Sequence, residues 1–160
     1  MTGNLYVTDA ETSAYKTSPY KNSMPSNTSD PSTVFHQLIT ALQQVLPSAN
    51  LAKTYVPLLS KPNQPFYLWL IDPDFCHEDL TLAVIENLWK NCPYWVFAWA
   101  SGQVLAQYIL QQPQMVRNKV VMDFGAGSGI VGIAAKMAGA KRVICCDIDR
   151  MSLTSCQAIA

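Results

Sequence analysis

The residues best suited to chemistry lie in the last third of the chain. Two acids, Asp123 and Asp147, flank a run of three glycines, Gly125, Gly127 and Gly129. A glycine has no Cβ, so backbone amides in such a run can closely approach a bound ligand. An acid that ends a strand can accept hydrogen bonds from ribose hydroxyls. This pattern predicts a site for an adenosine-containing cofactor.

The segments around these residues predict the elements that position them. Val120–Phe124 is apolar apart from its acid and is typical of a parallel strand buried on both faces. A helix of small residues is expected to begin near Ile130 and end at Gly139. A second strand, 143–146, then ends at the second acid. The order strand, glycine turn, helix, strand predicts an α/β fold, with residues 118–160 forming the first half of a Rossmann-like cofactor-binding domain.

The glycines also satisfy the dinucleotide fingerprint, at Gly127, Gly129 and Gly132, with Asp147 placed 20 residues after the first of them. An NAD(P)-linked oxidoreductase is therefore an alternative. Asp123 argues against it, because a carboxylate beside the turn would repel a pyrophosphate. The same carboxylate would stabilise a cofactor that carries a sulfonium and an ammonium group. The chain also shows no constellation for hydride transfer.

At these residues the chain resembles the class I S-adenosylmethionine-dependent methyltransferases. Their first motif is similar to Asp123-x-Gly125-x-Gly127-x-Gly129, and Asp147 falls at the acidic position that ends their second strand. A wider series is similar to the electron-transfer-flavoprotein β-subunit lysine methyltransferases and their relatives, some labelled nicotinamide N-methyltransferase-like. That series comprises Pro93-Tyr94-Trp95, Trp99, Ser101-Gly102-Gln103, the helix end 134–140 and Asp147-Ile148-Asp149. The resemblance covers roughly Val56 to Ala160.

The resemblance implies that S-adenosylmethionine is the cofactor and that its methyl group passes to a neutral amine. The acceptor would be a protein lysine, with the electron-transfer-flavoprotein β subunit as the family's example, or a small amine. It assigns no catalytic residue, since positioning supplies most of the catalysis. It assigns cofactor binding to Asp123, Gly125, Ala126, Gly127, Gly129, Asp147, Trp99 and Ser101.

The aromatic stretch 94–99 has two interpretations that remain open. Its large side chains suit a hydrophobic core, or some of them wall a cofactor or substrate pocket. In the second case Ser101 and Gly102 would allow a close approach at a helix start. The helix from Gly102 to Gln111 is expected to carry Val104, Leu105, Tyr108 and Ile109 on one side.

The earlier part of the chain predicts a tail and a supporting region. Residues 1–33 are rich in Ser, Thr, Asn and Pro and are expected to be a disordered tail. Residues 34–117 are expected to pack on the methyltransferase core. A helix is expected to start at Asp30-Pro31, just before this region, and to stop at Pro47. A short strand or extended segment is expected at 66–71, and a second helix from about Glu78 to Lys90.

Composition excludes several classes of partner. The 160 residues hold 11 basic and 11 acidic side chains, so no net charge draws the chain to nucleic acid or anionic lipid. No apolar run is long enough for a membrane span, and the start lacks a secretory signal, which predicts a cytoplasmic protein. The five cysteines have no zinc-site spacing, so no metal is expected.

The chain ends soon after its second predicted parallel strand, whereas a class I domain has a seven-stranded sheet. We therefore expect a truncated or split reading frame with an uncovered sheet edge and poor solubility in isolation. This expectation supports a third hypothesis, a catalytically incomplete fragment that binds a cofactor or a partner. Nothing in residues 1–160 identifies the groups that would bind an acceptor.

Overall fold

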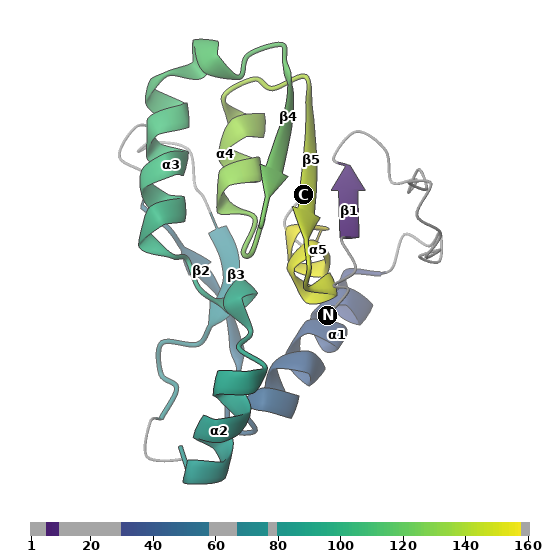
Figure 1. The fold of residues 1–160 in the computed structure, drawn as a ribbon, viewed down its shortest axis with the longest axis vertical. Coiled ribbons are helices and arrows are strands. Elements are labelled where there is room, and N and C mark those ends of the chain that lie inside the picture. Colours follow the sequence, from purple (N-terminus) through teal and green to yellow (C-terminus); the bar gives the residue numbers. More distant parts are fainter. Residues whose placement is uncertain (1–5, 10–29, 58–66, 77–79, 158–160) are drawn as a thin grey trace.

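The computed structural model describes residues 6–9, 30–57, 67–76 and 80–157 (Figure 1). It is an α/β structure, as expected from the sequence. The elements in chain order are β1 (Tyr6–Asp9), α1 (Pro31–Val45), β2 (Leu51–Tyr55), β3 (Tyr67–Ile71), α2 (Leu82–Lys90), the 3₁₀ turn η2 (Tyr94–Val96), α3 (Ala100–Gln111), the 3₁₀ turn η3 (Pro113–Met115), β4 (Val120–Phe124), α4 (Ile130–Met137), β5 (Arg142–Asp147) and α5 (Arg150–Gln157).

The larger sheet has the strand order β1-β5-β4. β4 and β5 are parallel, with Asp123 opposite Cys145 and Phe124 opposite Cys146. They are joined through α4, as a parallel pair requires a crossover. This confirms the predicted strand, glycine turn, helix and strand, and the carboxyl ends of both strands meet at one edge, where the turn begins.

The first strand corrects the expectation of a disordered tail over residues 1–33. Tyr6–Asp9 forms β1, which pairs antiparallel with β5 from Tyr6↔Asp147 to Asp9↔Ile144. Strand pairing uses backbone groups, so a short edge strand needs no apolar periodicity and leaves little trace in composition. Residues 1–5 and 10–29 lie outside the described part of the chain.

The smaller sheet is a hairpin of β2 and β3. The strand expected at 66–71 is confirmed as Tyr67–Ile71, and Phe66 lies outside the described residues. Its partner, Leu51–Tyr55, was not predicted. The two pair antiparallel from Leu51↔Ile71 to Tyr55↔Tyr67. The partner was missed because the long, proline-containing connection between the strands carries no hairpin signal.

Two helices flank this hairpin. α1 begins at Pro31 after Asp30, as predicted, and ends at Val45 before Pro47. α2 is shorter than expected, because it begins at Leu82, where Thr81 accepts a hydrogen bond from Val84 N at 3.3 Å. The Thr81 hydroxyl satisfies an amide that has no partner inside the helix, which sets the helix start at this point. Residues 77–79, part of the expected helix, lie outside the described residues.

The buried side chains form two clusters. The first core lies between β4, β5 and helices α3, α4 and α5, and it includes Leu68 and Leu70 of the hairpin. The second core lies between α1, β2 and η2, with Trp95 and Val96 fully buried in it. The core interpretation of the aromatic stretch therefore holds for Trp95.

The outer face of α3 is apolar but largely uncovered. Ile109 is buried, but Val104, Leu105 and Tyr108 are 70%, 47% and 49% exposed. The helix packs on α4 through the side of Gly102 and Ala106 instead. Small residues allow the two helices to approach closely, so α3 turns the side with Gly102 and Ala106, rather than its larger apolar side chains, towards α4.

β4 is also not buried on both faces. Val120, Met122 and Phe124 are 59%, 61% and 74% exposed, whereas Asp123 is buried. Both α4 and α5 pack on the face that carries Cys145, and among the described strands β4 is an edge of its sheet. The other face of β4 is therefore open in this chain.

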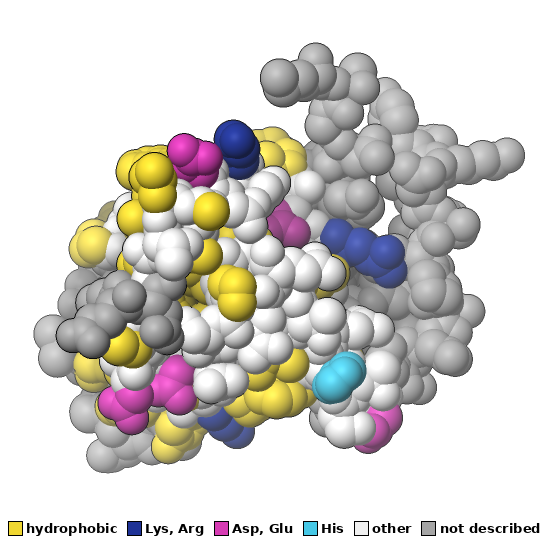
Figure 2. All heavy atoms as spheres, turned by 90° about the horizontal axis from the view of Figure 1, so that it is seen from below, with side chains coloured by type: hydrophobic (Ala, Val, Ile, Leu, Met, Phe, Trp, Pro, Cys, Tyr) yellow, Lys and Arg dark blue, Asp and Glu magenta, His cyan; other side chains and the backbone are white. Residues whose placement is uncertain are grey.

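The surface carries few charges. Figure 2, which views the molecule from below, shows Lys and Arg side chains apart from one another and apolar side chains at several places between them. None of the described helices is both long and apolar enough to cross a membrane.

Candidate functional site

The glycine turn after β4 adopts a backbone that side chains disfavour. Gly125, Gly127 and Gly129 have φ angles of 77°, 52° and 79°, all in the left-handed region. Gly129 is the N-cap of α4. For an L-residue with a Cβ this conformation costs about 1–2 kcal/mol, so glycine is required at each position. The turn thus ends with backbone amides gathered at the start of a helix.

The neighbouring strand holds the turn in place. The amides of Gly125 and Ala126 both donate to the carbonyl oxygen of Cys146, at 2.8 and 3.1 Å. Ala126 also buries its side chain in the first core. A Cβ placed on Gly125 would meet no atom within 4 Å. One side of the turn is therefore fixed to β5, and at Gly125 the other side is open to a ligand.

Asp147 ends β5 and binds the turn directly. Its Oδ2 accepts a hydrogen bond from Gly127 N at 2.8 Å, and its Oδ1 accepts one from Asp149 N at 2.9 Å. A carboxylate has about four acceptor positions, so these two amides leave capacity for further donors. Asp147, which is predicted to bind the ribose, thus also holds the glycine turn through Gly127.

Asp123 lies on the side of β4 that faces α4. It is buried, and its Oδ2 accepts a hydrogen bond from Gly132 N at 2.8 Å, in the first turn of α4. Burial raises the pKa of Asp123, the hydrogen bond from Gly132 lowers it, and the nearby charge of Asp147 raises it. Asp123 therefore fixes the start of α4 and contributes negative charge to the turn.

Asp149 is a site residue whose role the sequence analysis missed. Its amide binds Asp147, and its Oδ1 accepts a hydrogen bond from Met151 N at 2.8 Å, at the start of α5. Burial raises the pKa of Asp149, the hydrogen bond from Met151 lowers it, and the charge of Asp147 raises it. An aspartate just before a helix is an N-cap signal that could have identified it. We call residues 123–132 together with Asp147 and Asp149 the glycine corner.

The predicted residues of the aromatic stretch lie at the start of α3. Trp99 is the N-cap of this helix and 48% exposed, and its indole N–H donates to the Tyr94 carbonyl at 2.9 Å. Its ring contacts those of Phe97 and Tyr94, with centroids 5.4 and 5.8 Å away. Ser101 is exposed in the first turn of the helix.

The start of α3 adjoins the start of α4. A Cβ on Gly102 would lie 2.9 Å from Cγ2 of Ile130, so the two helix starts are in close contact there. The structure thus brings six of the eight predicted residues into one corner. Trp99 and Ser101 lie at the start of α3, beside this corner. The indole N–H of Trp99 donates to the carbonyl of Tyr94 in its own loop.

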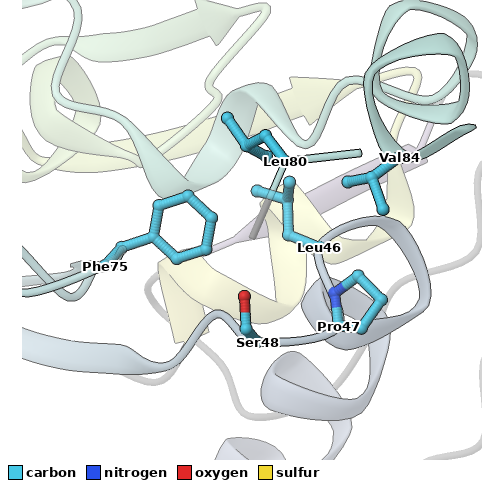
Figure 3. A pocket seen from close by; sticks show the side chains of 6 residues that line it. All are labelled: Leu46, Pro47, Ser48, Phe75, Leu80 and Val84. Atoms are coloured by element: carbon cyan, nitrogen blue, oxygen red, sulfur yellow. The ribbon is translucent and has the colours of Figure 1, made fainter. Parts of the chain in front are cut away.

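A separate hollow lies at the end of α1, near α2. It is lined by Leu46, Pro47, Ser48, Phe75, Leu80 and Val84 (Figure 3). None of these residues belongs to the glycine corner. The lining is apolar except for one hydroxyl, so it offers no groups for acid–base or group-transfer chemistry. Within the described residues, no three His, Cys, Asp or Glu side chains gather as a metal site would require.

Comparison with known proteins identifies the region around the corner. Residues 103–159 match the model of the family described as ribosomal protein L11 methyltransferase (PrmA). The chain is 48% identical over 64 residues to the electron transfer flavoprotein beta subunit lysine methyltransferase of Homo sapiens, which is 39% of this chain and 24% of that protein.

Two further relatives extend the match. The homolog of that enzyme in Caenorhabditis elegans is 36% identical over 88 residues, 55% of this chain and 31% of the relative. Protein N-terminal and lysine N-methyltransferase efm7 of Schizosaccharomyces pombe is 34% identical over 92 residues, 57% of this chain and 34% of the relative. The matched region thus spans about a quarter to a third of the length of these relatives. No solved structure matches the chain.

Proposed function

We propose that this chain is part of a class I S-adenosylmethionine-dependent methyltransferase and acts in transferring a methyl group from S-adenosylmethionine to a protein lysine. One observation carries this proposal. Asp147 binds the left-handed glycine turn, Asp123 binds the start of the helix that follows it, and Asp149 binds Asp147. The charge of Asp147 acts on both of the other acids. Such a corner favours a cationic ligand over a pyrophosphate.

The residues present fit this cofactor. The turn is open at Gly125, so its backbone can approach a ligand. Asp147 keeps acceptor capacity for ribose hydroxyls after binding Gly127 and Asp149. Asp123 holds the start of α4 and would supply negative charge for the methionine part of the cofactor. When bound, S-adenosylmethionine supplies an electrophilic methyl group on a sulfonium.

Methyl transfer to a neutral amine requires little acid–base catalysis from the protein. The acceptor amine must be neutral and in line with the methyl group, so positioning dominates the catalysis. The names of the relatives support a lysine acceptor, with the electron-transfer-flavoprotein β subunit as the first candidate. The five free cysteines of the described residues support a reducing compartment, and we place the reaction in the cytoplasm.

The cofactor is tested by calorimetry with S-adenosylhomocysteine and NAD, titrated separately into the full chain. We expect the thioether to bind and NAD not to bind. Asp147→Ala should weaken binding roughly tenfold to a hundredfold, the range for a hydrogen bond to a charged group. Asp74→Ala, which removes an exposed acid away from the corner, is the matched control. Binding of NAD alone would overturn the proposal in favour of an oxidoreductase.

The acceptor is tested by incubating the chain and S-adenosylmethionine with purified electron-transfer-flavoprotein β subunit. Mass spectrometry of its lysines is the readout, and nicotinamide serves as a small-amine comparison. Methylated lysine in the presence of wild-type chain, and not of Asp147→Ala, supports the proposal. Cofactor binding without transfer to either acceptor would favour the alternative, a fragment that binds cofactor or a partner without catalysing the reaction.

A further inference from the structure

Charge is divided unevenly along the chain, although its total is zero. Residues 87–146 hold six basic side chains and one acidic side chain, Asp123, whereas the whole chain holds 11 of each. Five of the six bases lie within 117–119 and 136–142, next to the starts of β4 and β5. Asp123 is buried, and its carboxylate binds Gly132 near the other end of β4. The amino ends of the two strands therefore form a strongly basic region.

Backbone hydrogen bonds hold these bases next to one another. The carbonyl of Lys119 accepts from the amide of Lys141 at 2.9 Å, and the carbonyl of Gly139 accepts from Asn118 at 2.9 Å. The amide of Gly139 donates to the carbonyl of Lys136 at 2.9 Å. In Figure 1 the connection into β4 and the connection from α4 into β5 lie side by side at the top of the molecule. The fold thus gathers bases from three separate places in the sequence.

The turn that carries Arg117 and Lys119 has a defined backbone. Arg117 forms a β-bridge with Ala140, and a Cβ on Gly139 would lie 3.5 Å from Cγ of Arg117. Asn118, between the two bases, has a φ angle of 60°, a left-handed conformation that asparagine tolerates. Because these contacts already order the turn, a partner that binds there loses little backbone entropy.

The cations of this region are accessible. Its exposed bases, which we call the basic end, are Arg117, Lys119, Lys136 and Lys141. Arg142 is half-buried and is not counted, since β1 brings Asp9 opposite Ile144, two residues further along β5. Like charges that are gathered in this way repel one another, and an anionic partner relieves the repulsion.

The surroundings of the basic end favour an acidic protein segment over nucleic acid. Met115 and Val120, which flank the turn in the chain, are 47% and 59% exposed. Apolar side chains beside cations suit a protein partner, because protein interfaces combine an apolar centre with a polar rim. Proteins that bind single-stranded nucleic acid add aromatic rings on which bases stack. The sequence has no aromatic residue within 109–123 or 136–146.

We propose that the basic end is a docking surface for an acidic segment of a protein partner, bound by charge-assisted hydrogen bonds to the exposed lysine and arginine side chains. The glycine corner lies at the carboxyl ends of the same strands. The 5 residues of β4 separate the two places by roughly 16 Å, at about 3.3 Å per residue. A partner and a ligand of the corner can therefore bind at the same time. The docking surface does not rest on the proposed function.

The surface is tested with a fluorescein-labelled polyglutamate peptide, titrated into the full chain and followed by fluorescence anisotropy. We expect saturable binding at low salt. The affinity should fall roughly tenfold as the ionic strength rises from about 0.05 M to about 0.2 M, because a shorter Debye length screens exposed charges. A peptide that does not bind at low salt would overturn the proposal.

Paired substitutions assign the binding to the basic end. Lys119→Gln with Lys141→Gln removes two exposed charges and should weaken peptide binding roughly tenfold. Lys53→Gln with Lys90→Gln is the matched control, since it removes the same charge from exposed positions on β2 and α2. Lys119→Arg with Lys141→Arg keeps the charge and should retain the affinity. Equal losses in the two glutamine variants would show that only net charge matters, and would overturn the docking surface.

Two further titrations distinguish the other occupants. A single-stranded oligonucleotide of the same charge is expected to bind more weakly than the peptide. Tighter binding of the oligonucleotide that is lost in Lys119→Gln, Lys141→Gln would overturn the proposal in favour of a nucleic-acid site. The peptide affinity should not change in the presence of excess S-adenosylhomocysteine. A peptide that this compound displaces would lie in the glycine corner, and a separate docking surface would be wrong.

Discussion

The glycine corner and the second core hold their residues by different means. In the corner, each residue type is set by an individual contact: Asp147 accepts from Gly127, and Asp123 accepts from Gly132. In the second core, the apolar side chains of α1, Leu51 and Trp95 are buried and packed against one another. The first region therefore tolerates few residue types at each position. The second tolerates any set of apolar side chains of suitable volume.

The two regions accordingly respond to different substitutions. Shortening a buried side chain should destabilise the second core most. Adding a Cβ to a glycine should instead destabilise the corner. Changing charge should act only in the corner, where acids are buried. The following substitutions test this contrast, beginning with the largest expected effect.

Trp95→Ala should destabilise the chain by about 3–5 kcal/mol, because it removes the largest fully buried side chain of the second core. Urea unfolding followed by circular dichroism gives the free energy of unfolding. Tyr94→Ala is the matched control, since the preceding ring is 61% exposed and should cost about 1 kcal/mol or less. Equal losses for the two variants would show that the second core is not held by burial.

Gly129→Ala should destabilise the chain by about 2–4 kcal/mol. The alanine would have to adopt a left-handed backbone, and its Cβ would press against Cys156. Gly125→Ala shares the left-handed strain, with φ of 77°, but its Cβ meets no atom. It should cost only about 1–2 kcal/mol. Urea unfolding of both variants isolates the contact with Cys156 from backbone strain. The prediction is wrong if the two variants lose the same free energy.

Asp123→Asn should produce the smallest change, about 1 kcal/mol or less, and one that depends on pH. The folded-state pKa of Asp123 is raised above its ordinary value. Its contribution to stability is therefore fully present below the unfolded pKa and is lost as pH rises through the folded pKa. Asparagine does not titrate, so the variant should gain stability relative to wild type between acid and neutral pH.

Urea unfolding of both proteins at several values between pH 3 and pH 7 gives this difference. Asp74→Asn is the control, because this acid is exposed and lies outside the glycine corner. A difference between Asp123→Asn and wild type that stays constant, or that moves the other way, would contradict a raised pKa.

The contrast between the regions also explains what could be predicted from sequence. The turn at Gly125, Gly127 and Gly129 was visible because left-handed backbone and close approach demand glycine at fixed intervals. Asp147 was visible because it follows a strand. The bonds from Gly127 and Asp149 to Asp147 were not visible, since they depend on how the turn closes in space.

Pairing between distant segments was the least predictable part of the fold. β2 joins β3 across a proline-containing connection, and β1 joins β5 across more than a hundred residues. Neither pairing leaves a local pattern, because backbone hydrogen bonds do not depend on side-chain type. The burial of β4 on both faces was mispredicted for a related reason. Periodicity shows that a face is apolar, and neighbouring elements decide whether it is covered.

The open side of β4 has a consequence for how the chain behaves at high concentration. Val120, Met122 and Phe124 are exposed on one face of this strand, and among the described strands its outer edge has no partner. An apolar strand with a free edge is a template onto which another strand can add, in the way that seeds aggregation. The strand that leads into the glycine turn is thus also a place on the described chain where self-association can begin.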